Sequence, residues 1–269
     1  MKISIVTPTW NGAKWLPRCI ESVLGQELAP GDELEYRVAD GGSRDGTIAV
    51  LETYAKHLAG WTSEPDKGPA DALNKTFAQC SGDVFGWLNA DDLYRPGALK
   101  ALGEAVRRHP GKAIYFGKCR IVNPAGEEIR GFPTLVKNAC FPFSSRFLIR
   151  SINYLSQPAS WFRREAWERI GGRIRTDFKA AWDYDLTLRL WGAGGGQTIP
   201  GEALSDFTWH PGSISGSQYE RQFGEELEAA LQDAGKWSLP GILHRGVKAG
   251  ILFCYRRMNA QAQPRGGRE

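Results

Sequence analysis

The stretch VFGWLNADD, residues 84–92, is an apolar run that ends in two adjacent carboxylates. Val84 to Leu88 has the length and composition of a buried strand, and Asn89, Asp91 and Asp92 follow it directly. Because neighbouring carboxylates repel each other, their place at a strand end carries an electrostatic cost. A bound cation or a shared proton would offset that cost.

Other predicted strands also end in polar residues. Apolar runs predict strands at 3–7, 36–39 and 84–88, and helical spacing predicts helices at 16–24, 45–54, 71–80 and 96–109. The segments TPTWNG (7–12) and ADGGSRDGT (39–47) close the first two strands, and EPDKGPADALNK (64–75) precedes a helix. Ligands bind at the carboxyl ends of strands in open α/β sheets, so TPTWNG, ADGGSRDGT and LNADD are expected to share one cleft.

Composition is typical of a soluble globular protein. The chain has 269 residues, of which 42% are hydrophobic and 24% charged, enough for one large domain or a domain with a subdomain. Five scattered cysteines without CxxC spacing argue against a disulfide framework or a zinc site. The N-terminal MKISIVTPTWNG is predicted to be a first strand rather than a signal peptide, which favours a cytoplasmic location.

Positive charge is concentrated at the C-terminus. Between Lys236 and Glu269 there are seven basic residues and one acid, which gives this segment +6 and leaves −2 for the rest of a chain whose total is +4. An acidic body argues against a nucleic-acid partner. The apolar runs within the helix-like segment 241–259 are too short to span a bilayer. It is expected either to lie on the inner face of the cytoplasmic membrane or to pack on the domain with a solvated basic face.

The second half is less regular. Residues 123–151 contain three prolines and are predicted to be mostly loop, whereas helical spacing returns at 164–170, 183–190 and 217–234.

Several polar residues at the strand ends are candidate ligand contacts. Asp40 can accept hydrogen bonds from a base or ribose, although ADGGSRDGT would also make a well-formed strand-to-helix turn. Asp91 and Asp92 can hold Mg²⁺ or Mn²⁺, which prefer oxygen ligands, or they can favour the N-terminus of the next helix. Pro8 and Thr9 are placed at the mouth of the cleft, and Lys67 lies on a nearby loop.

Seven motifs occur in an order that resembles family 2 glycosyltransferases. They are PTWN (8–11), DGGSRDGT (40–47), EPDKGPADALNK (64–75), LNADD (88–92), QPASWFRREAW (157–167), WDYDLTLRL (182–190) and HPGSIS (210–215). This resemblance implies a GT-A fold, an α/β/α sandwich with a mixed central sheet. It places a glycosyltransferase domain at 1–215, with a nucleotide-sugar half at 1–110 and an acceptor and catalytic half at 111–215. A helical, basic extension follows at 216–269.

The same resemblance implies a hexosyltransferase that inverts the anomeric carbon. It implies a nucleotide-diphospho-sugar donor, UDP-sugar being the commonest, and Mn²⁺ or Mg²⁺ as cofactor. The acceptor would be a saccharide or a lipid-linked saccharide, as in cell-surface polysaccharide or glycoconjugate biosynthesis. Residues that match the family pattern take these roles: Pro8, Thr9, Asn11, Asp40, Asp66 and Lys67 at the nucleotide, Asp91 at the ribose or the metal, Asp92 as metal ligand, and His210 completing the metal or diphosphate site. Asn89 stands where many relatives begin the motif with Asp, so the division of roles between Asp91 and Asp92 stays open.

The catalytic base is expected in WDYDLTLRL. Inversion requires a carboxylate that takes the proton of the acceptor hydroxyl. Asp183 and Asp185 diverge by about 200° around a helix, so only one can face the cleft. The family pattern favours Asp183, which could alternatively cap that helix. Among the aromatic residues, Trp161, Phe162 and Trp182 are candidates to stack on an acceptor sugar.

Two other functions fit parts of the pattern. A sugar-1-phosphate nucleotidyltransferase has a related core, but it should carry a basic, glycine-rich loop after the first strand, which TPTWNGAKW does not match. A non-catalytic sugar-nucleotide-binding assembly protein would have no need of both metal carboxylates and a base. The absence of a QxxRW motif favours single additions over processive synthesis.

Overall fold

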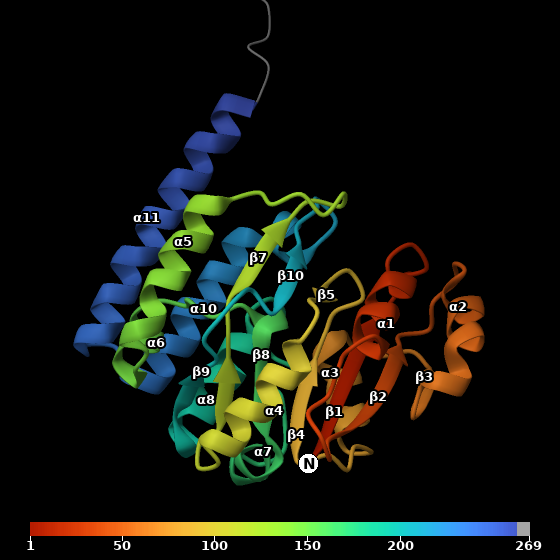
Figure 1. Cartoon of the computed structure of the whole chain (residues 1–269). Coiled ribbons are helices and arrows are strands. Elements are labelled where there is room, and N and C mark those ends of the chain that lie inside the picture. The colour runs from red at the N-terminus through yellow and green to blue at the C-terminus, as the bar shows by residue number, and fades with distance from the viewer. Residues whose placement is uncertain (263–269) are drawn as a thin grey trace, which may run out of the picture.

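A computed structural model describes the backbone of residues 1–262 and the side chains of residues 1–213 and 216–253. The first half alternates strands and helices as expected (Figure 1): β1 (Lys2–Thr9), α1 (Leu16–Leu24), β2 (Glu33–Asp40), α2 (Thr47–Tyr54), η1 (Ala55–His57), β3 (Gly60–Ser63), α3 (Pro69–Phe77), β4 (Val84–Trp87), β5 (Leu93–Tyr94) and α4 (Ala98–Arg108).

The second half adds strands to the same sheet and a group of helices beyond it. Its elements are β6 (Ile114–Phe116), β7 (Cys119–Val122), α5 (Gly131–Cys140), η2 (Phe141–Phe143), α6 (Arg146–Ser151), η3 (Gln157–Ala159), β8 (Ser160–Arg163), α7 (Arg164–Arg169), α8 (Trp182–Gly194), β9 (Gly196–Thr198), β10 (Ser205–Thr208), α9 (Ile214–Ser217), α10 (Tyr219–Ala234) and α11 (Leu239–Ala262).

The main sheet has the order β3-β2-β1-β4-β8-β6-β9. Strands β3, β2, β1 and β4 are parallel, whereas β8 runs antiparallel to both β4 and β6. A second sheet has the order β5-β10-β7, with β10 parallel to β7 and antiparallel to β5. The mixed central sheet that the sequence predicts is therefore confirmed.

Both faces of the main sheet are buried, because alternate residues of its strands point to opposite sides. Ile3 and Ile5 of β1 pack in a cluster with residues of α1 and α4, whereas Val6 packs in the opposite cluster with α3 and α8. In Figure 1 these layers lie on either side of the strands, and α5, α6, α10 and α11 gather at the end furthest from α2 and β3. The fold is an α/β/α sandwich with a helical extension.

Residues 123–151 differ from the predicted loop, since they contain α5 and α6. Pro133 lies in the first turn of α5, where a missing N–H is tolerated. Thr134 is the buried residue of α5, so the apolar residues of this helix do not face the core. Phe132, Leu135, Val136 and Ala139 do recur at helical spacing, but the three prolines of the segment favoured a loop.

Register brings three polar residues to one edge of the sheet. Thr9 of β1 pairs with Asp40 of β2, and Asp40 pairs with Ser63 of β3. The LNADD turn follows β4, which neighbours β1 on its other side. The carboxyl ends of these strands thus form one side of the site.

Candidate active site

A cavity of about 820 Å³ opens at the carboxyl ends of β1 and β4. It is bounded by the first half of the chain on one side and by η3, the start of α8, the segment after β10 and α10 on the other. Its lining includes Pro8, Thr9, Trp10, Asn11, Trp15, Gly41, Asp66, Asn89, Asp91, Gln157, Trp182, Asp183, His210 and Gln222. The structure therefore brings together most of the predicted site residues, from both halves.

The two carboxylates of LNADD point in different directions. Asp91 lines the cavity with about a quarter of its side chain exposed, whereas Asp92 is fully buried. The Asp92 carboxylate accepts hydrogen bonds from the backbone N–H of Thr208 (2.9 Å) and from Nδ2 of Asn89 (3.2 Å). Burial, reinforced by the neighbouring Asp91 charge, raises the pKa of Asp92 well above its ordinary value. Contrary to the sequence-based assignment of a metal ligand, Asp92 does not line the cavity and ties the turn to β10.

His210 lies next to Asp91 in the cavity lining. Its Nε2 lies 3.1 Å from Oδ2 of Asp91, and its ring stacks on Trp15 with the centroids 5.0 Å apart. His210 follows β10 by two residues, so the bond from Thr208 to Asp92 also sets the position of this histidine. The pair combines a carboxylate with an imidazole whose orientation is fixed by stacking.

The side-chain amide of Asn89 stabilises the turn after β4 by hydrogen bonds. Its Nδ2 also donates to Oε1 of Gln157 (3.1 Å), and Gln157 Nε2 donates to the carbonyl of Trp87 (2.7 Å). The amide in place of the usual first Asp thus links β4 to η3.

Asp40 is buried, and both oxygens of its carboxylate accept hydrogen bonds. Oδ2 accepts hydrogen bonds from the N–H groups of Gly42 (3.1 Å) and Ser43 (2.9 Å) and from Oγ of Ser63 (2.6 Å), while Oδ1 accepts from Oγ of Ser43. Asp40 does not line the cavity, although the adjacent Gly41 does. In this structure the carboxylate holds the loop after β2 in place, as the turn interpretation predicts.

Pro8, Thr9 and Asn11 line the cavity at the end of β1. Oγ1 of Thr9 is buried without a hydrogen-bond partner among the described residues, so it can bond to a ligand. Asn11 has a left-handed backbone (φ 49°), and its Oδ1 accepts from the N–H of Arg44. These contacts join the loops after β1 and β2.

Asp66 lines the cavity, but Lys67 does not. Oδ1 of Asp66 accepts from the N–H of Gly68 (2.7 Å), and its Oδ2 lies 2.7 Å from where a Cβ on Gly41 would be. Gly41 is therefore required for Asp66 to lie in this position. The side chain of Lys67 is exposed to solvent, while its backbone N–H bonds Asp71.

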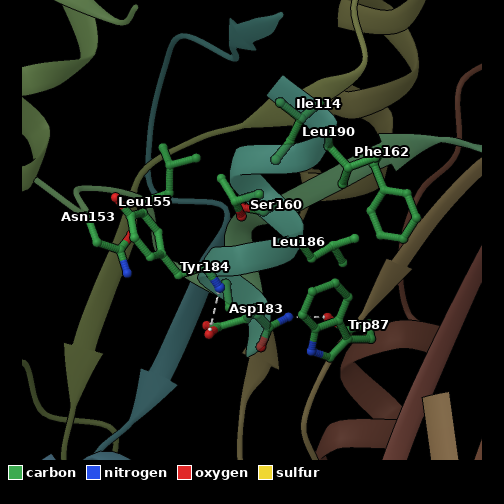
Figure 2. A pocket seen from close by; sticks show the side chains of 12 residues that line it. Trp87, Ile114, Asn153, Leu155, Ser160, Phe162, Asp183, Tyr184, Leu186 and Leu190 are labelled. Carbon is green, nitrogen blue, oxygen red and sulfur yellow. Dashed lines mark hydrogen bonds between the residues drawn. The ribbon is translucent and has the colours of Figure 1, made fainter. Parts of the chain in front are cut away.

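Asp183 lies at the first turn of α8, where the large cavity meets a small void behind it. Figure 2 shows its carboxylate hydrogen-bonded to the backbone N–H of Tyr184 (2.9 Å). Burial raises the pKa of Asp183 from 3.8 to about 6. Asp185 points elsewhere and pairs with Arg175 (3.4 Å) and Arg189 (2.8 Å). Asp183 is thus the carboxylate of α8 that faces the cavity.

Of the three aromatic candidates, only Trp182 lines the cavity. Trp161 and Phe162 are almost completely buried in the core, because they lie on β8 between β4 and β6. Their proposed stacking on an acceptor is therefore wrong. The Trp182 ring is tilted by 34° against Trp87 with the centroids 5.4 Å apart, which holds it at the cavity wall.

Several site residues were missed from the sequence. Trp15, Gln157 and Gln222 line the cavity, and Glu226 of α10 is buried behind Asp183. Asn153 Nδ2 (3.2 Å) and Gln222 Nε2 (3.1 Å) both donate to Oε1 of Glu226. Burial raises the pKa of Glu226 to about 7, and the nearby Asp183 charge adds to the shift. Gln157 lies within the motif QPASWFRREAW, which was the available signal, but nothing in the polar helix 217–234 marks Glu226.

This arrangement, a mixed sheet with an acid–histidine pair and a raised-pKa carboxylate around one cavity, is the GT-A glycosyltransferase type. The family model for glycosyl transferase family 2 matches residues 4–171, more than half of the chain. The chain belongs to glycosyl transferase family 2 and is a glycosyltransferase.

Relatives and solved structures agree with this classification. The chain is 31% identical over 190 residues to an uncharacterised glycosyltransferase of Mycobacterium tuberculosis, covering 70% of this chain and 68% of the relative. It is 29% identical over 191 residues to the chondroitin synthase of Escherichia coli, covering 70% of this chain but only 26% of that longer enzyme. S. aureus TarS 1–349 in complex with UDP-GlcNAc superposes with a TM-score of 0.70 at 20% identity, covering 94% of this chain and 72% of that one. Mannosyltransferase PcManGT from Pyrobaculum calidifontis, in complex with GDP-Man and Mn²⁺, gives 0.63 at 19% identity, covering 97% and 76%.

The residues present fit a divalent cation that shares its coordination with a substrate. Among the described side chains, no group of three or more His, Cys, Asp or Glu residues is arranged to hold a metal ion. Asp91 and His210 nevertheless offer one oxygen and one nitrogen to the same point of the cavity. Mg²⁺ and comparable ions are commonly bound by one or two protein groups together with substrate phosphates and water.

Proposed function

We propose that this protein is an inverting, metal-dependent glycosyltransferase. It would move one sugar from a nucleotide-diphospho-sugar, with a UDP-sugar as the first candidate, to a saccharide or lipid-linked acceptor in cell-surface polysaccharide or glycoconjugate synthesis. The observation that carries the proposal is that Asp91, His210 and Asp183 line one cavity large enough for donor and acceptor together.

The donor would lie along the ends of β1 and β2. Thr9 offers a buried hydroxyl without a partner, and Asp66 presents a carboxylate fixed by Gly68 and Gly41. The diphosphate would lie near Asp91 and His210, the pair that would hold Mn²⁺ or Mg²⁺. When bound there, the ion would supply positive charge to a departing nucleoside diphosphate. This assigns the metal to Asp91 and a structural role to Asp92.

Asp183 is the proposed general base. Its carboxylate accepts the proton of an acceptor hydroxyl, and the freed oxygen pair forms a bond to the anomeric carbon. The bond from that carbon to the diphosphate oxygen breaks on the opposite face, and the diphosphate leaves with the electron pair, so the configuration inverts. With a pKa of about 6, Asp183 is ionised at neutral pH yet is a stronger base than an ordinary aspartate. Trp182, next to it, offers an aromatic wall for the acceptor sugar.

A donor screen tests the proposal. Melting temperatures would be measured with UDP-, dTDP- and GDP-sugars, each with Mn²⁺ and with EDTA, because a ligand that binds only the folded state raises its stability. The expected result is stabilisation by a UDP-sugar that EDTA reduces. Stabilisation by GDP-sugars alone would reassign the donor, and a transfer product with retained configuration would exclude the inverting mechanism.

A further inference from the structure

The large apolar side chains that the protein exposes are not scattered. Apart from Trp10 at the cavity, those exposed among the described residues all belong to two segments, 132–147 and 237–253. The first comprises α5 to α6 and the second begins just before α11. The two segments are neighbours, because α6 packs against α11. Contiguous exposed apolar surface on a monomer marks a site of interaction.

The outward face of α11 is apolar between residues 239 and 250. Positions 239, 242, 243, 246, 249 and 250 are exposed, and they are Leu, Ile, Leu, Gly, Ala and Gly. The spacing of three and four residues places them on one side of the helix. The opposite side is fixed on the domain: His244 is buried, and its Nδ1 lies 3.0 Å from the carbonyl oxygen of Arg150. The apolar stripe therefore points away from the body, which is the reverse of an ordinary surface helix.

Basic and aromatic residues flank this stripe. Arg245 lies beside it at intermediate exposure, and Lys236 is exposed at the start of the segment, next to Trp237, which is 86% exposed. The Arg245 guanidinium lies 5.7 Å from the ring centre of Trp237. The sequence contains no acidic residue between positions 236 and 268. An apolar stripe with Lys and Arg beside it and an exposed Trp is the pattern of a helix that lies in a membrane interface.

The alternative to lying on the surface is crossing the bilayer. Within the described part of the chain, no helix is both long and apolar enough to cross a membrane. The helix α11 has 24 residues but is interrupted by Arg and Lys side chains.

We propose that the outward stripe of α11 rests on an anionic lipid surface, with Leu239, Ile242 and Leu243 at the acyl boundary and Arg245 and Lys236 at the lipid phosphates. A second copy of the chain fits less well. A twofold interface through this helix would bring its own basic residues together with no acid on the helix to offset them, since a symmetric contact uses the same patch twice. The proposal is independent of the proposed reaction, because it concerns only where the protein lies.

Flotation with lipid vesicles tests the proposal. The full chain would be mixed with neutral phosphatidylcholine vesicles and with vesicles that contain about a third phosphatidylglycerol. The expected result is flotation with the anionic vesicles only, weakened by salt. Ile242→Ser combined with Leu243→Ser should lower the bound fraction about tenfold, and Arg245→Gln combined with Lys236→Gln should lower it to a comparable extent.

Lys56→Gln is the matched control. It removes one exposed positive charge at η1, at the opposite end of the molecule, and should leave flotation unchanged. Unaltered melting temperatures of all variants would show that the fold is intact. Equal flotation of the serine variant and the parent would overturn the proposal. So would failure to float combined with a concentration-dependent dimer that the serine substitutions abolish, because the stripe would then be covered by a second copy.

Discussion

Oδ2 of Asp91 lies 3.1 Å from Nε2 of His210, although 119 positions separate the two residues in the chain. The contact joins the turn after β4 to the segment after β10, and the buried Asp92 makes it possible by binding the N–H of Thr208. Adjacent carboxylates thus have different roles in the structure: one faces the cavity and the other positions the histidine.

Asp91→Asn and Asp92→Asn should therefore behave differently. Asp91→Asn removes the charge that faces the cavity, so Mn²⁺-dependent turnover should fall on the order of a hundredfold. Asp92→Asn keeps an acceptor for Thr208 and removes a carboxylate whose raised pKa already disfavours its charge, so turnover should change less than about threefold. Mn²⁺ titrations of turnover measure both. Loss of metal dependence in the Asp92 variant alone would return the metal to that residue.

Asp183→Asn should bind the donor normally and lose transfer. The amide keeps the size of the side chain but cannot take a proton, so turnover should drop by at least about a hundredfold at every pH. In the parent enzyme, turnover should decline as pH falls through about 6, since the base is then protonated. Donor affinity by calorimetry and a pH profile of turnover are the measurements. Normal transfer by the variant would show that another residue, such as Asp185, is the base.

Glu226→Gln should stabilise the fold at alkaline pH. The pKa of Glu226 is raised from 4.5 to about 7, so the protonated form is favoured in the folded state and stability is lost as pH rises from about 4.5 through 7. The loss is of order 3 kcal/mol. The amide retains the acceptor for Asn153 and Gln222 without the charge. Its melting temperature should exceed that of the parent at pH 8 and match it near pH 4.

Glu228→Gln is the control for that measurement, because Glu228 is exposed on the same helix and accepts a bond only from Gln232 among the described contacts. A gain at pH 8 as large as that of Glu226→Gln would indicate a general effect of charge on α10.

Gly41→Ala should weaken donor binding with little effect on stability. Its Cβ would lie 2.7 Å from Oδ2 of Asp66, so Asp66 must move out of the cavity wall. We expect the dissociation constant for the nucleotide to rise about tenfold, by calorimetry. Gly46→Ala is the matched control, since its Cβ would make only an ordinary contact with Ala13 at 3.5 Å. This variant should bind the nucleotide as tightly as the parent does. Equal affinities for both variants would remove Asp66 from the donor site.

The alternating half of the fold could be predicted from the sequence because its strands and helices bury apolar residues with regular spacing. The polar strand ends also indicated that Asp91 faces a cleft, and the family resemblance added Asp66 and Asp183 to it. Spacing within a turn does not reveal which of two adjacent carboxylates faces inward, since that depends on Thr208, which is distant in sequence. The sequence left two roles open for Asp40, because the bond that Ser63 donates to it comes from another strand.

The C-terminal half was harder to predict for a different reason. Trp161 and Phe162 lie on a strand inserted antiparallel between β4 and β6, and no local pattern specifies that insertion. The apolar residues of α5 recur at helical spacing, but Pro133 among them made the segment resemble a loop. The C-terminal segment was predicted to be helical, and α11 packs against α6 and α10 while exposing Leu239, Ile242 and Leu243.

The bond between Asp92 and Thr208 also bears on how the protein is made. During synthesis the first half emerges more than a hundred residues before β10, and until then the Asp92 carboxyl has no backbone N–H from that strand to bind. Contacts between segments so far apart in sequence form late and slowly. Strands β1 to β4 can therefore form early, while the cavity is completed only after β10 and α10 have left the ribosome.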